Sequence, residues 1–341
     1  MTTTAPAPRR GRLRRADCAG PGIKRVRRGR GFSFSDLDGT LIEDEETLGR
    51  IRQLAIPPAW KEVWICPDPF GHIQATGYDE AGRKQYLYHA RWQQRQAERK
   101  FELIREFALK LPKLRRSVTA DLRREGMPRE RALACAVRLL DLGFFRVGSE
   151  VYAEENESFG LATVRREHVT IGKSEVVFDF PAKSGQRRIQ SIRDAAARRA
   201  LEEMYRRRGG PEDLLAYREG KEWRDVRSDE INEYIHEHIG DRFTAKNFRT
   251  WHGTVLAAVE LAGEEPPRSD AAAKRTIKRA VDRVSDALGN TPAVCRASYI
   301  DPRVIDRYRD GVTIKPAAAT NGRMTAKQRL KIEREVIGLV S

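Results

Sequence analysis

The sequence predicts an α+β protein, in which a small β-rich N-terminal domain precedes a larger, mainly α-helical domain with a short β-hairpin. Three observations support this prediction. Short apolar or alternating runs, separated by Pro and Gly, fill residues 32–90 and are typical of β-strands. From Arg91 onward, apolar residues recur at helical spacing. The stretch His168–Ile189 interrupts the helical pattern with β-branched and aromatic residues that strands favour.

The N-terminal domain is predicted over residues 32–90. Its clearest strands are expected at Val63–Ile65, Ile73–Tyr78 and Lys84–Tyr88. The preceding residues 1–31 hold ten Arg or Lys against a single acid, Asp17, among Gly, Ala, Pro and Thr. We expect this segment to be a flexible basic arm that adds nonspecific phosphate contacts.

One motif in the N-terminal domain needs its own interpretation. Asp36-Leu37-Asp38-Gly39-Thr40 matches the nucleophile loop of haloacid-dehalogenase-type phosphatases, in which an aspartate ends a buried apolar strand. Here the preceding Phe32–Ser35 alternates and is too polar for a buried strand, and no downstream acidic pair suits magnesium. We interpret the match as chance and keep a phosphatase that uses Asp36 as a minor alternative.

The helical domain is predicted over residues 91–341. Its first helices are expected at Trp92–Leu111 and Pro128–Leu142, and a turn at Pro181–Gly185 separates two strands of the hairpin. Further helices are expected at 193–207, 228–238, 245–262, 270–288, 292–299 and 325–338.

The end of one predicted helix and the start of the next form a corner. Gly289 suits the end of the first helix, Thr291 can cap the second, and Pro292 suits its first position. This arrangement leaves Asn290 in the corner and places Tyr299 near the end of a short helix.

The composition describes a folded and strongly basic chain of 341 residues. Hydrophobic residues make up 40% of it, which is enough for two or three domains with apolar cores. The formal net charge is +16 and the sequence pI is about 9.9. An excess of this size predicts a polyanionic partner, with nucleic acid as the first candidate.

Cysteine usage and hydropathy indicate the compartment. The four cysteines are scattered and lack the spacing of a zinc site, at Cys18, Cys66, Cys135 and Cys295. We expect reduced thiols in a cytoplasmic, nucleoid-associated protein. No apolar run is as long as a membrane span and nothing resembles a secretory signal, so we expect no membrane partner.

Four cations stand where they could serve a tyrosine that attacks phosphate. Arg146 follows the end of a predicted helix, and Lys183 lies at the tip of the hairpin turn. Lys246 and Arg249, three residues apart, share one face of another predicted helix. Each of them alone has an ordinary alternative as a salt-bridge partner or a solvated surface cation.

At these points the sequence resembles the type IB DNA topoisomerases, in the compact poxvirus-like form found in bacteria. The resemblance covers nearly the whole chain after the basic arm, in the order Gly31–Phe34, Ile56–Trp60, Lys84–His89, Phe145–Gly148, Glu154–Leu161, Lys183–Gly185, Lys246–Thr250 and Ser298–Tyr299. It implies relaxation of supercoiled DNA through transient cleavage of one strand and a 3′-phosphotyrosyl intermediate. It also implies a monomer that forms a clamp on double-stranded DNA, needs no ATP or metal, and is at most stimulated by magnesium.

The resemblance assigns the catalytic roles, and the residue chemistry suits them. Tyr299 is the expected nucleophile, and Lys183 the general acid that protonates the departing 5′-oxygen. Arg146 and Arg249 can clamp the nonbridging oxygens, since a guanidinium is always protonated and its fork fits phosphate. Asn290, where many relatives have histidine, can donate one more hydrogen bond.

The resemblance also predicts DNA contacts outside the catalytic set. Gln85 suits base-edge recognition, and Tyr86 and Tyr88 suit phosphate and apolar contacts from the opposite strand face. The alternative is that both tyrosines are core rings. Tyr152 matches a further DNA-contacting position, and Lys246 a phosphate contact or auxiliary catalyst.

Two other functional classes remain open at this point. A tyrosine recombinase shares the Arg–Lys–Arg–Tyr arrangement but usually carries His-x-x-Arg where this chain has Lys246-Asn247-Phe248-Arg249. A noncatalytic DNA-binding protein would account for the charge alone, yet it would never form a covalent adduct with DNA.

Overall fold

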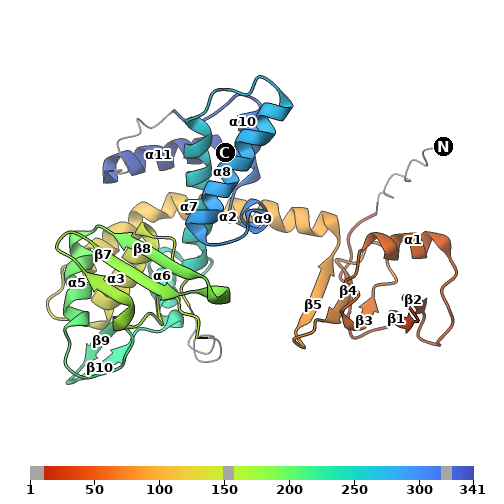
Figure 1. Cartoon of the computed structure of the whole chain (residues 1–341), viewed down its shortest axis with the longest axis horizontal. Helices are drawn as coiled ribbons and strands as arrows, with labels where there is room; N and C mark the ends of the chain where they lie inside the picture. Colours follow the sequence, from red (N-terminus) through yellow and green to blue (C-terminus); the bar gives the residue numbers. More distant parts are fainter. Residues whose placement is uncertain (1–10, 149–156, 316–324) are drawn as a thin grey trace. The chain divides into compact units, whose positions relative to one another are not determined.

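The computed structural model describes residues 11–148, 157–315 and 325–341, and the chain divides into two compact units (Figure 1). Unit 1 comprises Met1–Lys100 and unit 2 comprises Phe101–Ser341. Both combine helices with small antiparallel sheets, so the predicted α+β class is confirmed. The domain limits themselves stay a prediction, because helix α2 (Ala90–Asp121) begins at the predicted boundary and continues into unit 2.

Unit 1 is built on a five-stranded antiparallel sheet of order β2-β1-β3-β4-β5. Its strands are β1 (Ile23–Arg28), β2 (Gly31–Ser35), β3 (Lys61–Ile65), β4 (Ile73–Tyr78) and β5 (Lys84–Tyr88). The three strands expected from the sequence are therefore present. The buried core of the unit is small and consists of Ile23, Ile51, Val63, Ile65 and Ala75.

Two features of unit 1 differ from expectation. The predicted basic arm includes β1, whose Ile23 is buried in the core and whose backbone pairs with β2 and β3. Lys24, Arg27 and Arg28 are exposed and Arg25 is half-buried, so the composition of the strand is basic and gave no strand signal. Helix α1 (Glu45–Gln53) was not predicted, although Asp44 caps it by accepting a hydrogen bond from the Thr47 N–H at 2.9 Å.

Asp36 organises a turn at the end of edge strand β2. Its Oδ1 accepts hydrogen bonds from the backbone N–H groups of Asp38 at 3.0 Å and Thr40 at 2.9 Å. The carboxylate is thus committed to the local backbone, as is usual for aspartate in turns. The phosphatase alternative lacks the buried strand and exposed carboxylate that it requires.

Unit 2 is organised around two buried helices, α3 (Arg129–Leu142) and α7 (Ala245–Ala262). Helix α3 packs against α5 (Ala195–Tyr205), α6 (Ser228–Ile239) and α7. Helix α7 packs in addition against α8 (Asp270–Leu288), α10 (Pro302–Arg309) and α11 (Ala326–Leu339). These contacts fix α7 from several sides, so its side chains are held by the core of the unit.

Short sheets complete unit 2. Strands β6 (Val169–Ile171), β7 (Val176–Pro181) and β8 (Arg187–Ile192) form one antiparallel sheet, and the 3-10 turn η2 (Lys183–Gly185) connects β7 to β8. A hairpin of β9 (Ala216–Glu219) and β10 (Glu222–Asp225) was not predicted, and neither was α10. Asp301, whose carboxylate caps α10, and Pro302 at its first position are the signals that predict this helix in retrospect.

Candidate active site

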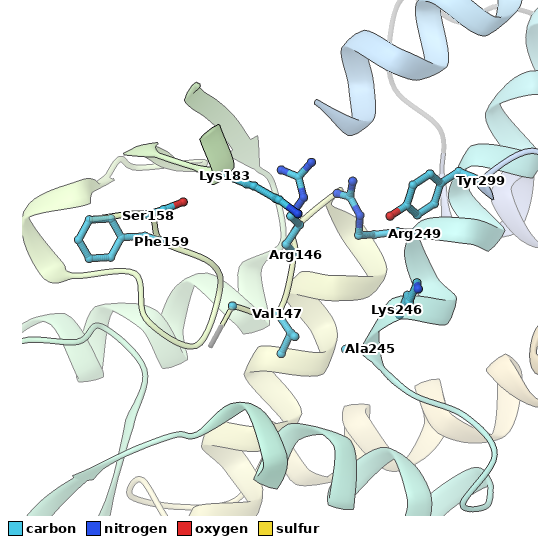
Figure 2. Close-up of a pocket in the computed structure, with 10 residues that line it drawn as sticks. Arg146, Val147, Ser158, Phe159, Lys183, Ala245, Lys246, Arg249 and Tyr299 are labelled. Atoms are coloured by element: carbon cyan, nitrogen blue, oxygen red, sulfur yellow. The ribbon is translucent and has the colours of Figure 1, made fainter. Parts of the chain in front are cut away.

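A pocket of about 360 Å³ in unit 2 gathers residues from separate parts of the chain (Figure 2). Its lining consists of Arg146, Val147, Gly148, Ser158, Phe159, Lys183, Ala245, Lys246, Arg249 and Tyr299. Four of the five residues predicted to be catalytic are therefore brought together, although 153 residues of sequence separate Arg146 from Tyr299. No carboxylate lines the pocket in the part of the chain that the structure describes.

The backbone around Arg146 is fixed by a close approach of two loops. Leu161 N–H donates to the Arg146 carbonyl at 2.8 Å, and Ala162 N–H donates to the Val147 carbonyl at 2.7 Å. Gly148 has a φ of +92°, and a Cβ on Gly160 would lie 2.3 Å from the Gly148 Cα. Glycine is required at both positions, and the result is a rigid support for the Arg146 side chain.

The Arg146 guanidinium lies half-buried at the corner between α8 and α9 (Pro292–Ser298). Its Nη2 donates to the Gly289 carbonyl at 2.7 Å and to Asn290 Oδ1. Burial lowers the pKa of Arg146, and the nearby Tyr299 acts in the opposite direction. The group remains a cation at neutral pH, since an arginine starts from a pKa far above 7.

Arg249 is more deeply buried than Arg146. Its Nη2 donates to the Leu288 carbonyl at 2.8 Å, and its Nη1 to the Phe144 carbonyl at 2.5 Å. Burial lowers the pKa of Arg249 to about 10, the Arg146 charge adds to this shift, and interaction with Tyr299 opposes it. Arg249 therefore stays protonated at neutral pH, and an anion that binds beside it would stabilise its charged form.

The corner between α8 and α9 has the predicted construction. Gly289 ends α8 with a φ of +60°, the Thr291 side chain caps α9, and Pro292 occupies its first turn. Asn290 lies between the helices with Oδ1 held by Arg146. Its Nδ2 is buried and has no hydrogen-bond acceptor of good geometry among the described residues; the Cys295 thiol nearby is only a weak partner.

Tyr299 ends α9 and is placed by α7. A Cβ on Gly253 of α7 would lie 2.5 Å from the Tyr299 carbonyl oxygen, so only glycine permits this approach. Thr254 Oγ1 donates to the same carbonyl at 3.4 Å. The Arg249 guanidinium carbon lies 5.3 Å from the centre of the Tyr299 ring, and Figure 2 shows the phenolic oxygen directed toward Arg249.

The predicted DNA-contact residues of unit 1 lie on β5. Tyr86 and Tyr88 are 42% and 39% exposed, with stacked rings 6.1 Å apart, so the interpretation as core rings is wrong. Gln85 lies on the other face, where its Nε2 donates to Asp79 Oδ2 at 2.9 Å. Tyr152 lies outside the described residues.

A third arginine, Arg188, lies near the pocket and was not predicted. Arg188, on β8 of the Lys183 hairpin, donates from Nη1 to the Asp286 carbonyl at 3.2 Å and from Nη2 to the Ala287 carbonyl. Burial and the nearby Arg146 charge lower the pKa of Arg188. Its position opposite Phe180 in the hairpin gave no sequence signal, because its partners are main-chain atoms distant in sequence.

Behind α7 lies a buried ion network. Arg115 contacts Asp141 at 2.8 Å and Glu333 at 2.6 Å, and Arg329 contacts the same two acids. His252, one turn from Arg249, is buried against Arg329, with His252 Nε2 3.1 Å from Arg329 Nη2. Burial lowers the pKa of His252 to about 3, and the Arg329 charge adds to the shift, so the ring is neutral.

Two further findings concern cofactors and membranes. Within the described residues, no group of three or more His, Cys, Asp or Glu side chains is placed to hold a metal ion. No helix in that part of the chain is both long and apolar enough to cross a membrane.

The pocket places a half-buried tyrosine beside two arginines and two lysines. Comparison with known proteins gives the family of the chain. Residues 89–326 match the family model of the eukaryotic DNA topoisomerase I catalytic core. Residues 31–79 match the N-terminal domain of bacterial DNA topoisomerase IB. The chain belongs to the type IB DNA topoisomerase family.

Curated relatives agree with this assignment. DNA topoisomerase 1B of Acanthamoeba polyphaga mimivirus is 30% identical over 297 residues, which is 85% of this chain and 88% of the relative. DNA topoisomerase 1B of Vaccinia virus (strain Copenhagen) is 28% identical over 160 residues, or 46% of this chain and 51% of the relative. DNA topoisomerase 1 of Schizosaccharomyces pombe is 28% identical over 165 residues, which is 48% of this chain and 19% of the relative.

Proposed function

We propose that this protein is an ATP-independent type IB DNA topoisomerase, and that Tyr299 is its nucleophile. The observation that carries the proposal is the pocket in which Tyr299 meets Arg146, Lys183 and Arg249 without a carboxylate among the described residues. A phosphodiester brings negative charge and needs positive donors already in place. The family membership of the chain agrees with this chemistry.

Cleavage begins when the Tyr299 phenolic oxygen attacks a backbone phosphorus of DNA. The Tyr299 O–P bond forms as the bond from phosphorus to the 5′-oxygen breaks, which leaves a 3′-phosphotyrosyl link. The phenol loses its proton to solvent in the positive field of Arg249, and no dedicated base is required. Lys183 donates a proton to the departing 5′-oxygen as general acid.

Arg146 and Arg249 stabilise the charge that grows on the nonbridging oxygens. Each guanidinium has five N–H donors, and main-chain carbonyls occupy only part of them, so the remaining donors are available for phosphate. The buried Nδ2 of Asn290 supplies a further donor whose partner, in this proposal, is a phosphate oxygen. Lys246, on the pocket rim, contacts a neighbouring phosphate.

Resealing reverses the same steps. The covalent link conserves the energy of the phosphodiester, so attack by the 5′-hydroxyl restores the strand without ATP. Rotation of the free strand between cleavage and resealing relaxes supercoils of either sign.

Two arginines and a lysine supply the positive charge that a metal would otherwise supply. In this proposal, magnesium acts only by competing for phosphates as product leaves.

The wider assembly follows from the same proposal. The two units form a clamp around double-stranded DNA, and the protein acts as a monomer. In unit 1, the exposed Tyr86 and Tyr88 rings bind the DNA backbone, and Gln85 exchanges its contact with Asp79 for a base edge. Tyr152 adds a contact from the catalytic unit. A net charge of +16 supports binding to a polyanion of this kind.

A tyrosine recombinase is the nearest alternative chemistry. Its usual His-x-x-Arg is replaced here by Lys246-Asn247-Phe248-Arg249, and the matched N-terminal model is that of a topoisomerase. Recombination between paired sites, with assembly of a tetramer, would favour the recombinase.

Relaxation of a supercoiled plasmid in EDTA without ATP tests the proposed function. Wild-type protein is expected to relax the plasmid and to become covalently attached to a nicked strand through Tyr299. Tyr299→Phe removes the attacking oxygen, so it is expected to bind DNA with unchanged affinity and to relax none. Relaxation by this variant, or a covalent link at another residue, would overturn the assignment of Tyr299.

A further inference from the structure

The C-terminal end of α8 collects the arginines of the active site. Four consecutive main-chain carbonyls, which we term the carbonyl cluster, each accept a hydrogen bond from an arginine side chain. Arg188 donates to the carbonyls of Asp286 and Ala287, Arg249 to that of Leu288, and Arg146 to that of Gly289.

Helix physics explains why cations gather at this place. The last four carbonyls of a helix lack partners within the helix, and they carry the negative end of its dipole. A guanidinium satisfies such oxygens and gains from their partial charge. Two of the three arginines are the proposed phosphate clamps. The third, Arg188, has no role in the reaction as described so far.

Arg188 differs from the other two in the element that carries it. It lies on β8, opposite Phe180 of β7, and these two strands meet at the turn that holds Lys183. Lys183 itself is exposed at the tip of the hairpin. Its ammonium group is therefore placed by the position of the whole hairpin, and Arg188 ties that hairpin to α8.

We propose that Arg188 is a positioning residue, which docks the Lys183 hairpin on the carbonyl cluster and so sets the general acid against the leaving oxygen. The inference rests on the proposed role of Lys183. A general acid must come within hydrogen-bond reach of the atom that it protonates. The carbonyl cluster also positions Arg146 and Arg249, so one short segment of backbone aligns the acid with both clamps.

The structure offers a matched control on the same strand. Arg187 precedes Arg188, and its side chain pairs with Asp179 within the hairpin at 2.6 Å. Both residues contribute one positive charge from β8. Of the described hydrogen bonds that these two side chains make, those of Arg188 reach α8 and those of Arg187 stay within the hairpin. Arg187→Ala therefore controls for lost charge and for the stability of the hairpin.

The test measures single-turnover cleavage of two DNA substrates, which have oxygen or sulfur as the 5′ bridging atom. Sulfur leaves without protonation, so it removes the need for the acid. Arg188→Ala is expected to slow cleavage of the oxygen substrate about 10- to 100-fold, the size of effect that misplacement by about 1 Å produces. On the sulfur substrate, the variant is expected to come within about threefold of wild type, since the clamps keep their own carbonyls.

Further variants sharpen the test. Lys183→Ala with Arg188→Ala is expected to be no slower than Lys183→Ala alone, since both act on one proton transfer. Arg188→Lys, which keeps the charge but has a single donor nitrogen, is expected to recover part of the rate. Arg187→Ala is expected to remain within about twofold of wild type on both substrates.

Three outcomes would overturn the proposal. Equal slowing of Arg188→Ala on both substrates would show a role in phosphate binding or overall structure. An unchanged rate on oxygen, or an additive double variant, would show that Lys183 is positioned without Arg188. If Arg188→Ala does not fold, Arg188→Lys and Arg188→Gln give the same sulfur-to-oxygen comparison. If the proposed function itself were wrong, wild type would cleave neither substrate, and this result differs from all three outcomes above.

Discussion

Unit 2 contains two clusters of buried and half-buried arginines that are held by different kinds of partner. In the ion network behind α7, Arg115 and Arg329 pair with the carboxylates of Asp141 and Glu333. In the pocket, Arg146 and Arg249 are held by main-chain carbonyls and the Asn290 amide, with no carboxylate bonded to either in the described structure.

The pKa shifts reflect this difference. Burial lowers the pKa of Arg115, but the hydrogen bonds and charges of Glu333 and Asp141 together outweigh this effect, so the pKa is raised. Burial, together with the charges of the neighbouring arginines, lowers the pKa of Arg249 to about 10. The first cluster is paired with carboxylates of the protein, whereas no carboxylate of the described residues bonds the second. A site that must bind phosphate benefits from donors held by weak partners, because a resident carboxylate would compete with the substrate.

The largest expected effect on the rate of the reaction comes from placing a carboxylate in the pocket. Asn290→Asp would set a full negative charge against Arg146, which now bonds the Asn290 Oδ1. We expect single-turnover DNA cleavage to slow by about 100-fold or more, since the anion repels phosphate and occupies its donor. We also expect stability to rise by about 1 kcal/mol, since a half-buried cation gains a partner.

Asn290→His is the matched control, since it keeps a neutral donor and is expected to stay within about tenfold of wild type. An Asn290→Asp variant that cleaves DNA at the wild-type rate would contradict the idea that the pocket is kept free of acids for phosphate.

The reverse change removes an acid from the ion network. Asp141→Asn leaves Arg115 and Arg329 with one carboxylate between them, and the Asp141 side chain is only 4% exposed. We expect the free energy of unfolding to fall by about 3–5 kcal/mol, as measured by urea denaturation. Asp179→Asn, which breaks the exposed pair with Arg187, is the control and should leave the urea midpoint unchanged. Loss of cleavage without loss of stability would show that the network serves the reaction instead.

A smaller effect is expected from acid. The pKa of His252 is about 3 in the folded protein, below the ordinary value near 6.5, so the unfolded chain binds the extra proton first. Stability is therefore full above pH 6.5 and falls as the pH drops toward 3. Between pH 7 and 4.5 we expect the free energy of unfolding to fall by about 2–3 kcal/mol more in wild type than in His252→Asn. The free energy of unfolding is measured by urea denaturation at each pH. If it falls equally in wild type and His252→Asn, protonation of His252 does not cause the loss.

The sequence predicted the parts of the site that local signals encode. Helices α7 and α8 match the ranges expected, and the corner of Gly289, Asn290 and Thr291 was predicted residue by residue from capping rules. Strand β1 and helix α1 were missed because charged side chains on their exposed faces obscured a small core.

Tertiary partners account for what the sequence could not predict. Arg188 bonds carbonyls almost a hundred residues away, and the bond uses no property of the side chains at 286–287. Similarly, Asp141 and Glu333 carry no sequence signal that pairs them through Arg115. The catalytic roles proposed for the pocket rest on the family resemblance and on the chemistry of its residues.

The carbonyl cluster has a consequence for how the site tolerates change. Its acceptors belong to the peptide backbone, so no replacement of a side chain at Asp286, Ala287 or Leu288 deletes them. The alignment of the arginines therefore depends on the path of the α8 backbone, and a side-chain change that preserves this path leaves the acceptors in place. At the exposed Asp286, a replacement is expected to change the surface of the protein while the carbonyl that accepts from Arg188 remains.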